Sequence, residues 1–226
     1  MAQEKEWDRE YKNSKFLTKE NKPQADVVRF VKWLKENNFN TENAKVLDLG
    51  CGTGRNSFYF AELGAKVIGI EISQTAINIA KENIKNVSFD ITYLKESIGN
   101  KLSFKDDYFD ILLDVTSSNS LSEEERETFL SETSRVLKAD GLFFTKALCK
   151  DGDNNAKTLL KKSPGKGKDT YVLPDIGVEE RVWSKEDFTR TYEKYFKILH
   201  MEKKTSYTRM SDRVYKRNFW IAYFSK

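Results

Sequence analysis

Three alternating glycines are the strongest chemical signal in the sequence. They stand in the run DLGCGTG at residues 48–54, directly after a short apolar segment. Glycine adopts positive φ without steric cost and lets a ligand approach the backbone closely. Open parallel sheets bind ligands in the crevice beyond the carboxyl ends of their strands. The run therefore predicts a ligand-binding turn at the end of a buried strand.

Two carboxylates indicate which ligand this turn holds. Glu71 ends the next apolar run, 21 residues after Gly50, where an acid can accept hydrogen bonds from both hydroxyls of a ribose. The glycine spacing is G-x-G-x-G, whereas a dinucleotide loop has G-x-G-x-x-G. Asp48 stands just ahead of the glycines, and its charge repels a pyrophosphate but attracts an ammonium or a sulfonium. These residues favour an adenosine-bearing cation as the ligand.

Short apolar runs alternate with amphipathic segments along most of the chain. We expect helices at 26–37, 55–63, 74–84 and 123–137, a capped helix start at 184–187, and strands at 45–49, 65–70, 87–94, 108–115 and 142–148, with a turn at 138–141. This alternation indicates a parallel sheet with helices on both faces. Two last strands, 196–207 and 218–224, are expected to pair as an antiparallel hairpin, because no crossover helix fits between them. The predicted fold is α/β, with a Rossmann-like seven-stranded sheet that is mostly parallel and has an antiparallel last strand.

The pattern predicts one domain over residues 1–226. Residues 1–40 are expected to form helices that cover the ligand, 41–148 the binding core, and 184–226 a C-terminal helix and β-hairpin. Residues 149–183 contain many glycines, prolines and lysines, and they are too long for a plain connection. We therefore expect this stretch to be a lid or substrate loop.

Composition excludes several classes of protein. No apolar run reaches the roughly 20 residues that span a bilayer, and the polar N-terminus is unlike a secretory signal. Two cysteines, Cys51 and Cys149, are expected to be reduced thiols of a cytoplasmic protein. Together with a single histidine, His200, these two cysteines predict no metal site.

The C-terminal part of the chain is basic. From Lys146 onward there are 19 Lys and Arg against 11 Asp and Glu. We interpret this excess as solvated surface rather than a nucleic-acid stripe, and we expect a monomer or a homodimer.

Residues 46–54, VLDLGCGTG, resemble motif I of the class I S-adenosylmethionine-dependent methyltransferases. Glu71, with Ile72 and Ser73 after it, resembles the ribose-binding acid of that family. The family's later landmarks also have counterparts, at Phe104, at Asp110 and in the segment 135–141. The resemblance covers about residues 7–148.

The resemblance implies a role for each residue around the turn. Asp48 and the backbone at Gly50 and Gly52 are expected to hold the methionine end of S-adenosylmethionine, Glu71 its ribose and Ile72 its adenine. Where the family often has an acid that contacts the adenine, this chain has Ser97, so backbone, Ser97 or the preceding Glu96 can make that contact. The expected cofactor-binding residues are Trp7, Tyr11, Asp48, Gly50, Cys51, Gly52, Gly54, Asn56, Glu71, Ile72, Ser73, Ser97, Ile98 and Asp114.

Two further sites follow from the resemblance. The segment WDREY at residues 7–11 resembles one that small-molecule methyltransferases of the tellurite-resistance and thiopurine type fold over the cofactor. Tyr11 either faces the sulfonium through a cation–π contact or, with Trp7, docks a helix onto the core. Asp114 ends the fourth strand, where the family has a residue that touches methionine or substrate. It is the first candidate for a general base if the acceptor carries a proton, and a lid residue is the second.

The compact core favours a small-molecule O, N or S acceptor. Methyl transfer requires mainly that acceptor and methyl group are held in line, so the lack of an evident base does not argue against an enzyme. The basic C-terminal part motivates an alternative, a methyltransferase acting on RNA or protein. A third reading is a catalytically silent cofactor-binding module. The residues after the fourth strand, DVTS at 114–117, lack the run that is typical of adenine or glutamine amide methylation.

Overall fold

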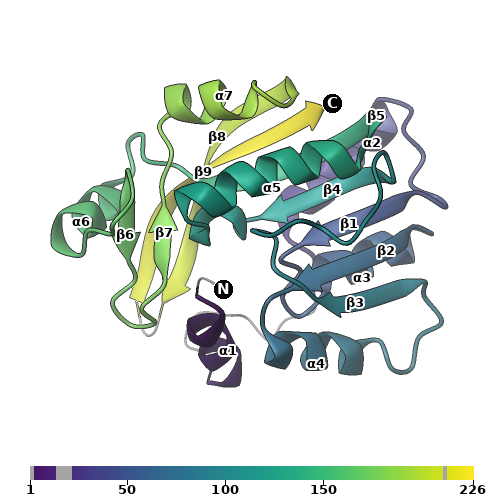
Figure 1. Cartoon of the computed structure of the whole chain (residues 1–226), viewed down its shortest axis with the longest axis horizontal. Helices are drawn as coiled ribbons and strands as arrows, with labels where there is room; N and C mark the ends of the chain where they lie inside the picture. Colours follow the sequence, from purple (N-terminus) through teal and green to yellow (C-terminus); the bar gives the residue numbers. More distant parts are fainter. Residues whose placement is uncertain (1–2, 14–21, 211–212) are drawn as a thin grey trace.

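A seven-stranded sheet runs through the molecule, with helices on both of its faces (Figure 1). The computed structural model describes residues 3–13, 22–210 and 213–226. The strands are β1 (Lys45–Leu49), β2 (Lys66–Glu71), β3 (Ile91–Lys95), β4 (Phe109–Val115), β5 (Leu137–Leu148), β8 (Lys197–Met210) and β9 (Arg213–Ser225). Their order is β3-β2-β1-β4-β5-β9-β8, and β9 is antiparallel to both of its neighbours. The predicted mostly parallel sheet with an antiparallel last strand is confirmed.

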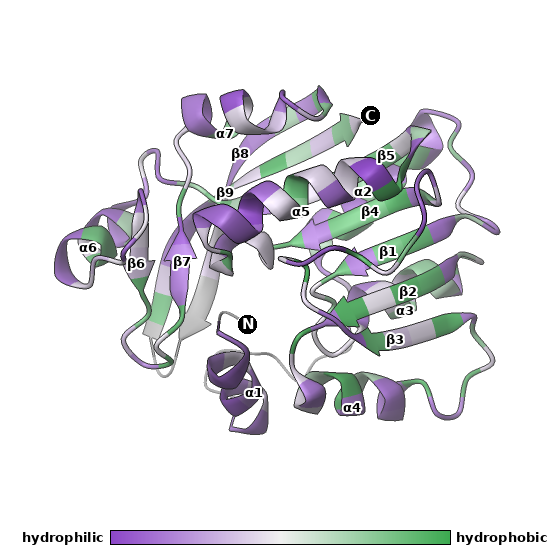
Figure 2. Cartoon of the chain, in the orientation of Figure 1, coloured by the Kyte–Doolittle hydropathy of each residue, from purple (hydrophilic) through white to green (hydrophobic). Residues whose placement is uncertain are grey.

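Two large hydrophobic clusters, one on each face of the sheet, and a smaller third cluster join the helices to the sheet. The helices are α1 (Glu4–Lys12), α2 (Ala25–Glu36), α3 (Arg55–Glu62), α4 (Gln74–Asn83), α5 (Glu123–Val136), α6 (Asn154–Lys162) and α7 (Lys185–Tyr192). One cluster includes Phe30 of α2 and Phe60 of α3, and the other includes Phe129 of α5 and Phe188 of α7. Because side chains alternate along a strand, β4 sends Ile111 and Leu113 into the first cluster and Leu112 into the second. Figure 2 shows the apolar residues of the central strands and the hydrophilic surface of α1.

Three predicted strand starts are wrong. The last strand, β9, begins at Arg213, before the start expected at residue 218. The third strand begins at Ile91, after the start expected at residue 87, and β5 begins at Leu137, where a turn at 138–141 was expected. Leu137 is fully buried and pairs with Phe109, and the register then shifts so that Ile111 pairs with Leu142. Burial of Leu137 thus starts the strand directly after α5, and the register shift absorbs the polar residues in between.

Residues 149–183 contain more regular structure than a loop. They form α6 and a separate two-stranded antiparallel sheet of β6 (Thr170–Val172) and β7 (Glu179–Arg181). The helix expected after this segment is present as α7, and the Ser184 hydroxyl caps it by accepting a hydrogen bond from the Asp187 backbone at 3.2 Å. Within the described part of the chain, none of the helices has the length and apolar character to cross a bilayer.

Candidate functional site

The glycine turn has a conformation that other residues adopt only with strain. Gly50, Gly52 and Gly54 have φ of 72°, 55° and 84°. A Cβ atom on Gly52 would lie 2.6 Å from the hydroxyl of Tyr11, and one on Gly50 would overlap the side chain of Ser117. The backbone of Gly50 donates a hydrogen bond of 2.9 Å to the carbonyl of Ile70, near the end of β2. The turn is therefore a tight cradle anchored between two strands.

Glu71 ties this cradle to the end of β2. One carboxylate oxygen accepts a hydrogen bond from the backbone of Gly52 at 3.1 Å, and the other accepts from the backbone of Ser73 at 2.9 Å. Burial raises the pKa of Glu71, although these backbone donors oppose the shift. A carboxylate has about four acceptor positions. Each oxygen therefore keeps capacity for a further donor, such as one hydroxyl of a ribose.

Asp48 lies beneath the cradle with only 2% of its surface exposed. Its carboxylate accepts a hydrogen bond from the hydroxyl of Ser57 at 2.6 Å. Burial raises the pKa of Asp48 to about 6, against the opposing effect of that hydrogen bond. Asp48 therefore supplies negative potential from below the turn rather than from the pocket surface.

A cavity lies above the cradle, between α1 and the segments that follow β3 and β4. Most of the predicted binding residues line it, namely Trp7, Tyr11, Gly50, Cys51, Gly52, Asn56, Glu71, Ile72, Ser97 and Ile98. Four predicted residues do not line it, namely Asp48, Gly54, Ser73 and Asp114. The structure thus gathers the N-terminal segment, the glycine turn and the ends of three strands around one space.

The lining also includes residues that sequence reasoning missed. These are Gln24, Thr53, Arg55, Val115, Thr116, Ser117, Ser120 and Leu121. The sequence contained a signal for the lining residues after β4, because parallel sheets bind ligands at the carboxyl ends of their strands. Arg55 also had one, because it follows the last glycine of the turn. The sequence contained no such signal for Gln24, since only tertiary packing brings the start of α2 to the pocket. Among the described lining residues, Arg55 is the only cation.

The three alternatives for the adenine contact all remain at the cavity wall. Glu96, Ser97 and Ile98 line it together. The Glu96 carboxylate accepts hydrogen bonds from the backbone and hydroxyl of Ser103 at 2.9 and 2.8 Å. The Ser97 hydroxyl accepts from the backbone of Gly99 at 3.2 Å. The hydroxyl of Ser97 still carries a proton to donate, whereas the Glu96 carboxylate is turned toward Ser103.

Helix α1 forms the outer wall of the cavity through Trp7 and Tyr11. Burial, followed by the nearby charge of Glu71, raises the pKa of Tyr11, so its phenol stays neutral. Trp7 lines the cavity and also packs against the cluster that contains Phe30. Trp7 therefore both packs against the core and lines the cavity, while the contact of Tyr11 with the sulfonium stays a prediction.

Asp114 lies under the turn that follows β4 and is fully buried. Its carboxylate accepts hydrogen bonds from the backbones of Ser117 and Ser118, each at 3.1 Å, and from the hydroxyl of Thr145 at 2.8 Å. The Ser118 hydroxyl donates as well. Burial raises the pKa of Asp114 despite these donors. The side chain thus shapes the turn and does not face the cavity.

Comparison with known proteins gives matches in the region that forms the cradle. Residues 46–141 match a family profile described as a methyltransferase domain. A ubiquinone biosynthesis O-methyltransferase of Bartonella quintana (strain Toulouse) is 34% identical over 107 residues, which are 47% of this chain and 42% of that protein. The chain thus spans less than half the length of this relative. The uncharacterized methyltransferase C750.03c of Schizosaccharomyces pombe is 30% identical over 102 residues, 45% of this chain and 70% of that protein.

A solved structure has the same fold over nearly the whole chain. It is the Burkholderia thailandensis 1,6-didemethyltoxoflavin-N1-methyltransferase with bound 1,6-didemethyltoxoflavin and S-adenosylhomocysteine. It superposes with a TM-score of 0.71 at 15% sequence identity, covering 99% of this chain and 86% of that one. At this identity the likeness concerns the fold alone.

Proposed function

The chain belongs to the class I S-adenosylmethionine-dependent methyltransferases, and we propose that it transfers the methyl group of that cofactor to a small-molecule O, N or S acceptor. Membership confirms the resemblance of residues 46–54 to the family's first motif. The observation that carries the proposal is that the glycine turn lies beside two buried carboxylates. Glu71 and Asp48 are both more than nine-tenths buried beside the glycine turn.

The residues present fit the cofactor. Gly50 and Gly52 line the cavity without side chains, so a ligand can approach their backbone closely. Glu71 is placed for the ribose, and Asp48 supplies the charge that attracts the ammonium and the sulfonium. Arg55 is the described lining cation that suits the methionine carboxylate. When bound, the cofactor supplies a methyl group on a sulfonium, which is a good electrophile with a neutral leaving group.

The main task of the protein is then to hold the acceptor in line with that methyl. The acceptor would supply the lone pair and the bound cofactor the methyl carbon, with S-adenosylhomocysteine as the leaving group, and a proton on the acceptor would pass to water. Positioning of this kind is worth up to roughly 7–11 kcal/mol in favourable cases. In this proposal Asp114 is a positioning residue for the turn after β4, because its carboxylate already accepts from that turn.

Two comparisons support a small-molecule acceptor. One relative is a ubiquinone biosynthesis O-methyltransferase, and one structure of the same fold holds the small molecule 1,6-didemethyltoxoflavin. In this chain, Trp7 and Tyr11 cover the cavity from outside, which suits a small acceptor better than a strand of RNA.

Calorimetry with S-adenosylhomocysteine tests the proposal, with NADH as the competing ligand. We expect micromolar binding of S-adenosylhomocysteine and none of NADH. Labelled S-adenosylmethionine is then offered with a small-molecule extract, with total RNA and with total protein. Label in the small-molecule fraction is the expected result. Label confined to RNA or protein would support the alternative acceptor, and tight NADH binding would overturn the assignment of the site.

A further inference from the structure

Ser120 is a buried polar group without a partner in the wall of the cavity. It ends the short 3-10 helix η1 (Ser118–Ser120), and 7% of its surface is exposed. Its hydroxyl has no hydrogen-bond partner among the described residues. Ser120 nevertheless lines the cavity, and rotation to another staggered rotamer can turn the hydroxyl toward a ligand. Because buried hydroxyls are rarely left unpaired, one at a pocket wall points to a partner that the ligand supplies.

The turn that carries Ser120 is held in a strained conformation. Thr116 has a φ of 69°, which is rare for a β-branched residue. The Asn119 side chain donates to the Thr116 carbonyl at 3.1 Å and accepts from the backbone of Leu148 at 3.2 Å, which ties the turn to β5. Asp114 also accepts hydrogen bonds from this turn from below. The turn is therefore held in its strained conformation by several contacts at once, as is found at many functional sites.

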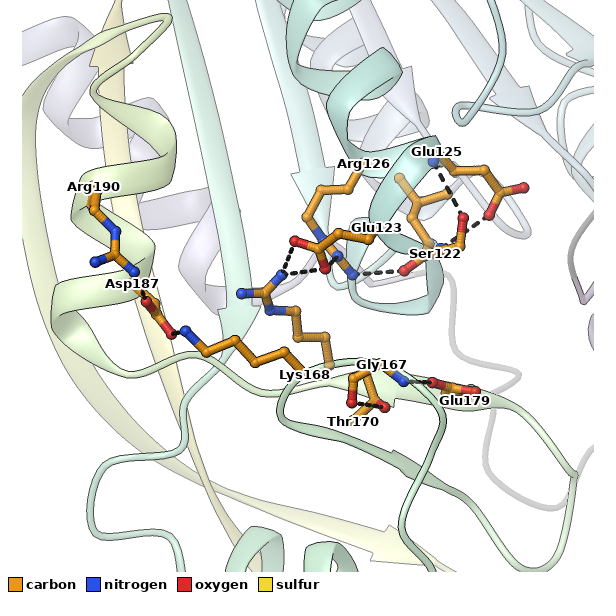
Figure 3. Close-up of polar contacts among 12 residues, drawn as sticks. Ser122, Glu123, Glu125, Arg126, Gly167, Lys168, Thr170, Glu179, Asp187 and Arg190 are labelled. Atoms are coloured by element: carbon orange, nitrogen blue, oxygen red, sulfur yellow. Dashed lines mark hydrogen bonds and ion pairs between the residues drawn. The ribbon is translucent and has the colours of Figure 1, made fainter.

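Side chains of Arg126, Arg181 and Gln3 hold the turn and its neighbouring residues from the outer side. Arg126 donates to the Leu121 carbonyl at 2.6 Å, and its guanidinium also pairs with Glu123 at 3.0 Å (Figure 3). Arg181 of β7 pairs with the same carboxylate at 2.7 Å. The Gln3 side chain donates to the carbonyls of Ser120 and Glu179. Helix α1 and the segment 149–183 thus close on the turn from two sides.

The position of this turn separates it from the ribose end of the cavity. Glu71 lies at the end of β2, on one side of β1, whereas η1 follows β4 on the other side and packs against β5 and β7. If the ribose lies at Glu71 and the methionine at the glycine turn, the part of the cavity beside η1 is left for the acceptor. Ser120 then faces the acceptor rather than the cofactor, an inference that rests on the proposed function.

We propose that the Ser120 hydroxyl is a specificity-determining contact to the methyl acceptor, and that the acceptor is a small uncharged aromatic molecule bearing a hydroxyl or an amine. The apolar residues that line the cavity with Ser120 include Trp7, Val115 and Leu121, and an aromatic body suits the indole of Trp7. The charged side chains among the described lining residues are Arg55, which begins α3, Glu71, which ends β2, and Glu96, which follows β3. None of them follows β4, where η1 lies. A charged acceptor buried beside Ser120 therefore lacks a described counter-charge.

The test measures binding of catechol, as an uncharged aromatic probe, to the protein saturated with S-adenosylhomocysteine. We compare wild type with Ser120→Ala and with Ser131→Ala, which removes an exposed hydroxyl of α5. Wild type and Ser131→Ala are expected to bind catechol equally. Ser120→Ala is expected to bind it about ten-fold more weakly, while its affinity for S-adenosylhomocysteine stays within two-fold.

Thermal melting adds a readout that needs no acceptor. Because the hydroxyl of Ser120 is unpaired, Ser120→Ala is expected to melt at the same temperature as wild type or higher. A clearly lower melting temperature would show that the hydroxyl has a structural partner and would overturn the inference. Equal catechol affinity in both proteins, absence of catechol binding to wild type, or tighter binding of the anionic probe 3,4-dihydroxybenzoate would overturn it as well. Failure of wild type to bind S-adenosylhomocysteine would instead count against the proposed function.

Discussion

The carboxylate of Asp8 on α1 accepts a hydrogen bond from the hydroxyl of Ser73 at 2.8 Å. The same oxygen accepts from the backbone of Thr75 at 2.9 Å, so Asp8 helps to cap α4 from a different helix. Lys12 lies 2.9 Å from the other oxygen. The Thr75 backbone donor and then Lys12 hold the pKa of Asp8 well below its usual range. This cap fixes α1, with Trp7 and Tyr11, over the cavity.

Replacing Asp8 is expected to loosen this wall of the site. Loss of a helix cap costs about 0.5–2 kcal/mol. If α1 must dock for the ligand to bind, Asp8→Ala weakens S-adenosylhomocysteine binding by about 3- to 30-fold, which calorimetry measures. Lys5→Ala, on an exposed position of the same helix, serves as the control and should leave the affinity unchanged. Equal affinities for Asp8→Ala and wild type would mean that α1 does not cover the ligand.

Glu71→Ala is expected to weaken cofactor binding by about 1.5–3 kcal/mol, the range for hydrogen bonds to a charged group. The substitution removes the ribose acceptor and also releases the backbones of Gly52 and Ser73. Calorimetry with S-adenosylhomocysteine gives the affinity, and Glu62→Ala on the exposed side of α3 is the matched control. Unchanged affinity in Glu71→Ala would remove this residue from the site.

Cofactor affinity is expected to fall as the pH is lowered through about 6. The pKa of Asp48 is about 6 in the folded protein because of burial, above its ordinary value of 3.8. The bound ammonium favours the ionised carboxylate, so protonation of Asp48 opposes binding, and the raised pKa of Glu71 acts in the same direction. Calorimetry between pH 5 and 8 measures this trend. Asp48→Asn should bind more weakly at pH 8 and show a flatter profile; a profile as steep as that of wild type would assign the titration elsewhere.

The same group has the opposite effect on folding. Because the pKa of Asp48 is higher in the folded than in the unfolded protein, the folded state binds more protons between these two values. Its contribution to the free energy of unfolding therefore increases as the pH falls from above 6 toward about 4. Melting curves of Asp48→Asn at pH 7 test this sign. The variant is expected to melt no lower than wild type, since it removes a buried charge and keeps an acceptor for Ser57.

Gly52→Ala is expected to reduce both stability and cofactor binding. A left-handed conformation costs a non-glycine residue about 1–2 kcal/mol, and the new methyl group would contact the Tyr11 hydroxyl. Gly177→Ala is the matched control, because its φ is 79° but its Cβ position has more room and lies outside the cavity. Both variants are expected to lose stability in urea unfolding, and Gly52→Ala more than Gly177→Ala because only its methyl group meets Tyr11. S-adenosylhomocysteine binding is expected to weaken only in Gly52→Ala. Adding Tyr11→Phe should restore part of the stability; no difference between the two glycine variants in binding would contradict the cradle.

Glu123→Gln is expected to destabilise the fold by about 1–3 kcal/mol. Glu123 neutralises Arg126 and Arg181, whose side chains are each 4% exposed. Breaking a buried ion pair costs 3–5 kcal/mol, and the 70% exposure of Glu123 reduces this value. The Lys168–Asp187 pair in Figure 3 is the control, since Lys168 is 58% exposed and such pairs contribute 0–1 kcal/mol. Urea unfolding of Glu123→Gln and Lys168→Met compares them, and equal losses would show that the two arginines do not depend on Glu123.

Local patterns in the sequence predicted the cradle well. The positive φ of Gly50 and Gly52 follows from alternating glycines after a strand, because few other residues accept that conformation. The meeting of Glu71 with the glycine turn follows from parallel strand order, since both lie at carboxyl ends of neighbouring strands. The sequence pattern also predicted that Asp114 lies near the end of β4. The pattern does not reveal that its carboxylate lies under the turn after β4 instead of facing the cavity.

The sequence by itself determined the parallel sheet, the glycine turn and the two acids beside it, because glycine conformation and strand periodicity act over a few neighbouring residues. Only the tertiary structure decided which side chains face the cavity. Gln24 arrives there through the packing of α2, and the turn that carries Ser120 is held by Gln3, by β5 and by β7. These segments are far apart along the chain, so their contacts depend on how whole elements pack rather than on local spacing.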